Sequence, residues 1–110
     1  MKVSEFAAKL GGQVITGEVG VDKQVKDIYC CDLLSWVMSH AVKGTAWITV
    51  HTHLNIVAVA SLSELSCIII PEGICADEAT VKRAVQEGIP IISTDLETYK
   101  ICCIAHECGI

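Results

Sequence analysis

Three short segments rich in apolar and β-branched residues, at 46–50, 67–70 and 89–93, most strongly limit how this chain can fold. One stretch with helical spacing of its apolar residues separates each segment from the next. Parallel strands need such crossovers, and right-handed crossovers keep successive strands in one sheet. We therefore expect an α/β fold in which residues 1–110 form one compact domain, with a mainly parallel central sheet flanked by helices.

Further elements are expected on either side of these three strands. An apolar helical face predicts a first helix, and its members are Val3, Phe6, Ala7 and Leu10. More strands are expected over 13–16 and 25–30, and more helices over 34–41, 54–65, 78–87 and 95–107.

Polar residues of the types that cap helix starts precede four of these helices, at Ser4, Asp32, Thr52 and Asp77. Thr94 and Glu97 have the spacing of a capping box, which predicts that the last helix begins at Asp95. Gly88 is placed to end the helix before it.

The composition limits the partners and the location of the protein. With 110 residues, 52% of them hydrophobic, the chain can bury a core of its own. Its apolar runs, such as 56–60 and 67–70, are far shorter than the roughly 18 residues that a membrane span needs. A net charge of −5 with scattered Lys and Arg does not favour nucleic acid. We expect a soluble, cytoplasmic protein with no membrane or nucleic-acid partner.

Chemically able side chains cluster directly after the first of the three core strands, at His51, His53 and Asn55. Open α/β sheets bind ligands at the carboxyl ends of their strands. Two histidines spaced by two residues on a strand lie on one face, about 6–7 Å apart, which suits two ligands of one metal or an anion clasp. The alternative is that one histidine caps the next helix and the other is solvated.

The same sheet edge should also receive the turn at 71–73 and the end of the strand at 93–94. We therefore predict a ligand site built from His51, Thr52, His53, Asn55, Glu72, Gly73, Ser93, Thr94, Asp32 and Ser35. Helix capping is the competing role for Asp32 and Ser35, and backbone hydrogen bonding is the competing role for Asn55.

Seven cysteines without any C-x-x-C spacing do not form a recognisable metal or disulfide framework. We expect reduced thiols that pack as small apolar residues. On the last helix, His106 shares a face with Cys102 or Cys103, which makes half of a metal site at most. A complete site would need Cys30, Cys31, Cys67 or a second subunit.

Several segments together resemble the DRTGG domain family. They are Asp32 to Met38, Trp47 to Thr49, His51 to Ala60, Cys67 to Ile70 and Glu87 to Thr94. The likeness is greatest to small stand-alone members, which are related to the amino-terminal domain of HPr kinase/phosphorylase and often associated with iron-only hydrogenase genes. It covers about residues 2 to 106, although the pentapeptide that names the family is absent. The turn at 71–73 is the nearest counterpart of that pentapeptide.

The resemblance implies a regulatory or ligand-sensing α/β domain that supplies no catalytic centre. The residues agree, because Lys43-Gly44-Thr45 lacks the upstream glycine and the loop of a phosphate-binding P-loop. HPr kinase activity is therefore not expected of this chain.

We expect a non-catalytic regulatory domain that binds a small molecule, such as a nucleotide or another anion, or a partner protein. The alternatives are a metal or iron–sulfur accessory protein of a hydrogenase-type redox system, and an enzyme with a concealed site. No cofactor is predicted. Apolar residues on two sides of the last helix, Leu96, Tyr99 and Cys103 on one and Ile101, Ile104 and Cys108 on the other, predict a homodimer or a stable protein partner.

Overall fold

A computed structural model describes all 110 residues, and its centre is a five-stranded sheet with the order β1-β5-β4-β3-β2. The strands are β1 (Gln13–Val14), β2 (Asp27–Cys30), β3 (Thr45–Ile48), β4 (Cys67–Ile70) and β5 (Ile91–Ser93). Strands β2 to β5 are parallel, whereas β1 pairs with β5 in the antiparallel sense. The predicted parallel α/β core is therefore confirmed.

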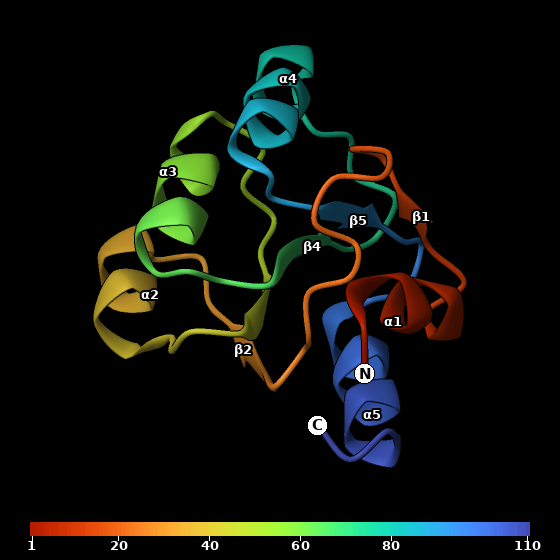
Figure 1. Cartoon of the computed structure of the whole chain (residues 1–110). Coiled ribbons are helices and arrows are strands. Elements are labelled where there is room, and N and C mark those ends of the chain that lie inside the picture. Colours follow the sequence, from red (N-terminus) through yellow and green to blue (C-terminus); the bar gives the residue numbers. More distant parts are fainter.

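Five helices cover the two faces of this sheet. They are α1 (Val3–Lys9), α2 (Leu34–His40), α3 (Asn55–Leu62), α4 (Glu78–Glu87) and α5 (Thr98–Glu107). Figure 1 shows α2, α3 and α4 on one side of the sheet, and α1 and α5 on the other, where both chain ends also lie. No helix is long and apolar enough to cross a membrane.

The middle strand β4 explains why the sheet needs helices on both faces. All four of its residues are buried, as expected for a parallel strand covered on both sides. Ile68 and Ile70 pack in the core under α2, α3 and α4, whereas Cys67 and Ile69 pack in the core under α1 and α5. The short apolar run therefore serves two hydrophobic cores at once.

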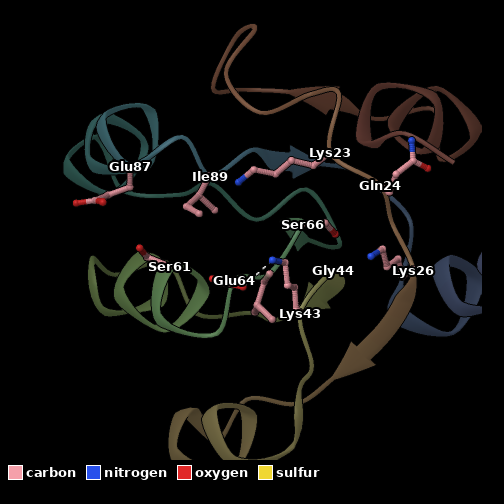
Figure 2. A pocket seen from close by; sticks show the side chains of 11 residues that line it. Lys23, Gln24, Lys26, Lys43, Gly44, Ser61, Glu64, Ser66, Glu87 and Ile89 are labelled. Carbon is pink, nitrogen blue, oxygen red and sulfur yellow. Dashed lines mark ion pairs between the residues drawn. The ribbon is translucent and has the colours of Figure 1, made fainter.

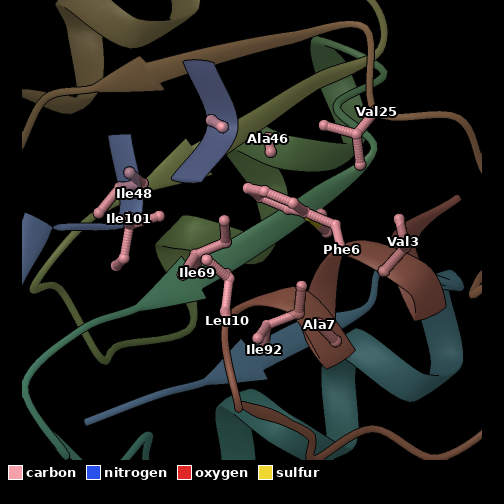
Figure 3. Packing of buried hydrophobic residues seen from close by; sticks show 12 residues of the cluster. Val3, Phe6, Ala7, Leu10, Val25, Ala46, Ile48, Ile69, Ile92 and Ile101 are labelled. Atoms are coloured by element: carbon pink, nitrogen blue, oxygen red, sulfur yellow. The ribbon is translucent and has the colours of Figure 1, made fainter. Parts of the chain in front are cut away.

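The core on the α1 and α5 side is centred on Phe6, which is fully buried. Figure 3 shows Phe6 of α1 and Leu10, which follows that helix, facing Ile69 of the sheet, with Ile101 of α5 beside Ile48. The inner face of α5 is thus used for packing, while Tyr99 on the same helix is 70% exposed.

Two of the expected helix boundaries are confirmed and four are wrong. Asp77 is the N-cap residue of α4, and Gly88 ends that helix with a φ of 70°. The N-cap residues of the other four helices are Lys2, Leu33, Leu54 and Glu97, so Ser4, Asp32, Thr52 and Thr94 do not begin helices.

Tertiary hydrogen bonds account for two of these differences. The side chain of Asp32 accepts hydrogen bonds from Thr49 and Val50, which directly follow β3, and the hydroxyl of Thr94 donates to the carbonyl of Leu10 at the end of α1. Side-chain oxygens that could cap a helix are equally able to join neighbouring segments. Sequence spacing alone does not distinguish these uses.

Candidate functional site

The strands β2 to β5 all end at one edge of the sheet, which we call the carboxyl edge, and Asp32 joins the first two of these ends. Its Oδ1 accepts hydrogen bonds from Thr49 Oγ1 at 2.8 Å and from the Val50 N–H at 3.0 Å. Thr49 itself is buried and donates its N–H to the Ile69 carbonyl of β4. The carboxylate of Asp32 therefore holds the backbone where the histidines follow.

The two predicted histidines contact different partners. The Nε2 atom of His51 bonds to the backbone carbonyl of Asp32, and the side chain of His53 meets Asp77 with 3.0 Å between Nδ1 and Oδ2. The intervening Thr52 contributes its backbone carbonyl, which accepts from Thr80 Oγ1 at 2.6 Å. The loop after β3 is thus anchored to β2 on one side and to α4 on the other.

The other two predicted segments, at the ends of β4 and β5, are hydrogen-bonded to each other. The Glu72 N–H donates to the Leu96 carbonyl at 2.9 Å, and the Gly73 N–H donates to the Thr94 carbonyl at 3.0 Å. Glu72 has a φ of 59°, which is uncommon for a residue other than glycine. Ser93 is the last residue of β5 and pairs with Ile70.

Three of the predicted segments, 51–53, 71–73 and 93–94, therefore lie at one sheet edge. The segment between β4 and α4 links them, because the Asp77 N–H donates to the Thr52 carbonyl. Ser35 and Asn55 are exposed in the first turns of α2 and α3, and their side chains have no protein hydrogen bond. No group of three or more His, Cys, Asp or Glu side chains is placed to hold a metal ion.

A cavity of about 480 Å³ opens at the opposite end of the parallel strands, which we call the amino edge. Figure 2 shows the side chains around it, which come from the segments before β2, β3, β4 and β5 and from the last turns of α3 and α4. The lining residues are Lys23, Gln24, Lys26, Lys43, Gly44, Ser61, Glu64, Leu65, Ser66, Glu87 and Ile89.

Three lysines and two glutamates make this cavity positively charged in a chain whose net charge is −5. Glu64 pairs with Lys43 at 3.1 Å, and Glu87 pairs with Arg83 on the same helix at 3.6 Å. Lys23 and Lys26 have no carboxylate partner. Two ammonium groups therefore remain without a countercharge at this edge.

Lys23 has a contact that limits its freedom. Its Nζ donates to the Gly88 carbonyl at the end of α4, 2.8 Å away, where the helix dipole favours a cation. Partial burial lowers the pKa of Lys23 below its ordinary value, although the nearby Cys67 opposes that change. Lys26, with no such contact, is the lysine that is free to meet a ligand.

The back of the cavity contains a polar atom without a partner. Ser66 is 2% exposed, and its Oγ makes no hydrogen bond within the protein. A buried hydroxyl without a partner costs about 1–3 kcal/mol. Ser66 lies beside Leu65 and Ile89, which are buried apolar residues.

The sequence profile of the DRTGG domain matches residues 5–108. This chain belongs to the DRTGG domain family. The resemblance seen in the sequence is thereby confirmed over nearly the whole domain. No curated protein sequence matches this DRTGG domain.

A solved structure shares the fold of this DRTGG domain. It contains the CBS and DRTGG domains of the regulatory region of Clostridium perfringens pyrophosphatase, complexed with its activator, diadenosine tetraphosphate. The TM-score is 0.71 at 14% sequence identity, and the match covers 94% of this chain but 45% of that chain. The chain thus spans less than half the length of the pyrophosphatase fragment.

Sequence reasoning missed the amino edge of this DRTGG domain. A signal was present, because Lys23 and Lys43 precede the strands predicted over 25–30 and 46–50, and Lys26 lies near the start of the first of them. Residues before parallel strands meet at one sheet edge in the same way as residues after them. The predicted site lies at the carboxyl ends of the strands, because ligands of open α/β sheets most often bind there.

Proposed function

We propose that this DRTGG domain is a non-catalytic regulatory domain that binds a small phosphorylated molecule of the nucleotide class in the amino-edge cavity. The observation that carries this proposal is the cavity of about 480 Å³ with two lysines that lack a carboxylate partner. Pockets for small molecules typically measure about 300–1,000 Å³. The pyrophosphatase fragment of similar fold was solved with an activator that also carries phosphates.

The two sides of the cavity suit the two parts of such a ligand. Lysine ammonium groups bind phosphates as point charges, and Lys26 is free to do so. Leu65 and Ile89 line the cavity and offer an apolar wall for a ring. Anion binding would also place a countercharge beside Lys23.

We assign this cavity to binding and not to chemistry because its potential nucleophile is not activated. Ser66 Oγ has no hydrogen-bond partner, so no base is placed to remove its proton. The acidic side chains of the cavity, Glu64 and Glu87, pair with cations. Regulation would follow if ligand binding altered a surface that a partner protein contacts.

The carboxyl edge is a second candidate location for the same ligand. His51 is partly buried at the end of β3, and one ring nitrogen is free because Nε2 contacts the Asp32 carbonyl. Carboxylates surround this edge at Asp32, Glu72 and Asp77, which opposes an anion unless a histidine is protonated. Binding at this edge should therefore weaken as pH rises through the histidine range.

Titration calorimetry with ATP and with inorganic phosphate tests the proposal. Lys26→Ala should weaken ATP binding by about tenfold or more, since it removes one charge-assisted contact of about 1.5–3 kcal/mol. Lys100→Ala on α5 is the matched control, because Lys100 is an exposed lysine on the other side of the sheet and should bind like the natural protein.

Four results would contradict the assignment. Equal ATP affinity of Lys26→Ala and the natural protein would exclude the amino edge, and loss of affinity in His51→Ala would move the site to the carboxyl edge. Absence of heat with ATP and phosphate between about pH 5.5 and 8, around the ordinary histidine pKa, would exclude the ligand class. A visible absorption band with bound iron would favour the metal or iron–sulfur accessory role.

A further inference from the structure

Two cysteines that are far apart in the sequence meet where α5 packs on the edge strand β2. Cys30, the last residue of β2, and Cys102 of α5 have their Sγ atoms 3.2 Å apart. The two residues are separated by 72 positions. None of the seven cysteines forms a disulfide. The Cys30 and Cys102 thiols are within hydrogen-bond distance of each other.

We propose that Cys30 and Cys102 form a reversible modification site, at which a small disulfide such as oxidised glutathione converts the two thiols into an intramolecular disulfide. The bond requires an S–S distance of about 2.05 Å, so the sulfurs must approach by about 1.1 Å. A change of side-chain torsion can supply such a movement, without separating α5 from β2. The site does not depend on the proposed ligand.

Access favours this pair over the other thiols. Cys30 is exposed and Cys102 is partly buried, so a small disulfide can reach the pair, whereas Cys67 is fully buried. Cys75 is also exposed, but no second thiol lies beside it. Oxidised glutathione can therefore leave a mixed disulfide at Cys75, while the pair can go on to an internal bond.

The exchange is balanced by two equivalents of reduced glutathione. The thiolate of Cys102 attacks one sulfur of the oxidised glutathione, whose S–S bond breaks, and the departing glutathione thiolate takes up a proton. The thiolate of Cys30 then attacks the Cys102 sulfur, which forms the internal bond and releases a second glutathione. The two protein thiols lose two electrons and two protons in total, and the glutathione disulfide gains them.

The environment of Cys30 supports this order of attack. Burial, followed by the contact with Cys102, raises the pKa of Cys30 to about 12. Its thiol is therefore protonated at neutral pH and is a poor first nucleophile. Formation of the mixed disulfide at Cys102 removes that thiol and leaves Cys30 as the resolving group.

The bond would fasten the α5 layer to the edge of the sheet. Cys30 precedes Cys31, whose carbonyl accepts from the buried Trp47 Nε1, and Asp32, which joins β2 to β3. A disulfide at Cys30 would thus restrain the segment that positions the carboxyl edge. Oxidation should make both α5 and this edge more resistant to unfolding.

Peptide mapping after incubation with oxidised glutathione tests the proposal on the full chain. Cleavage after Lys26, Lys43 and Lys100 leaves Cys30 with Cys31 in one fragment, and Cys102 with Cys103 and Cys108 in another. We expect these two fragments to be linked in the oxidised monomer, and the link to disappear on reduction.

Neighbouring cysteines supply matched control variants. Cys30→Ser and Cys102→Ser should each abolish the link, whereas Cys31→Ser and Cys103→Ser should keep it. The proposal is overturned if the link persists in Cys30→Ser or Cys102→Ser, or if the fragments stay unlinked in the natural protein. Circular dichroism of the reduced variants establishes that each one is folded. If a serine variant fails to fold, fragmentation spectra of the linked peptides from the natural protein identify the bonded cysteines.

Discussion

Replacing Gly20 by alanine should destabilise the fold much more than the same change at Gly17. Both glycines have left-handed backbone angles, with φ of 66° and 72°. A Cβ atom at Gly20 would lie 2.6 Å from the carbonyl oxygen of Gly88, whereas a Cβ atom at Gly17 would meet nothing within 4 Å. Comparing the two variants therefore separates the cost of the left-handed backbone conformation from the cost of the steric clash.

The expected magnitudes follow from these two terms. An alanine in the left-handed conformation destabilises the folded state by about 1–2 kcal/mol relative to glycine. Alanine also restricts the unfolded chain, which stabilises the protein by about 0.4–1 kcal/mol. Gly17→Ala should therefore lower the free energy of unfolding by about 0.5–1 kcal/mol. Gly20→Ala adds an overpacking cost of about 1–3 kcal/mol, because backbone atoms must move, so its total is about 2–4 kcal/mol.

Urea denaturation followed by circular dichroism measures the difference. With a slope of about 1.5 kcal/mol per molar urea, the midpoint should fall by about 0.5 M for Gly17→Ala and by about 1.5–2.5 M for Gly20→Ala. Equal midpoints for the two variants would refute the close approach of the 20 and 88 segments. Since the Gly88 carbonyl also holds Lys23, Gly20→Ala should weaken ATP binding as well.

Three further predictions concern the carboxyl edge, the buried thiol and association. Asp32→Ala should lower the free energy of unfolding by about 1–3 kcal/mol through loss of two hydrogen bonds. Asp32→Asn should lower it by less, because its side-chain oxygen can still accept these hydrogen bonds. Equal urea midpoints for the two variants would contradict a structural role of Asp32. Burial raises the pKa of Cys67 to about 12, above its unfolded value of 9.0, so the folded state keeps a proton that the unfolded state releases between those pH values. Stability should therefore fall by up to about 1.4 kcal/mol per pH unit above pH 9, and Cys67→Ala should remove that part of the slope in urea titrations at pH 8 to 10. Exposed apolar side chains surround α2, including Leu33 and Trp36, which are 61% and 50% exposed, and we expect a second copy of the chain to cover them. Light scattering at about 50 μM should show a homodimer, because dimers with micromolar dissociation constants form at that concentration. A monomer at that concentration would contradict this prediction.

The sequence alone determined the three core strands, their parallel pairing and the family. Burial on both faces makes a parallel strand continuously apolar, so 67–70 is visible without any tertiary information. The helices between successive strands then require a parallel sheet, and the edge shared by 51–53, 71–73 and 93–94 follows from that topology. These properties depend on periodicity along the chain, which a sequence contains directly.

Tertiary structure alone decided how the polar side chains are used. Asp32 and Thr94 have the residue types of helix caps, yet they bond to segments that are distant in sequence. The contact of Cys30 with Cys102 depends on where α5 lies against β2. The amino-edge cavity likewise exists only because loops before four different strands meet there. A hydrogen bond or a cavity depends on distances in space, and spacing along the chain does not contain those distances.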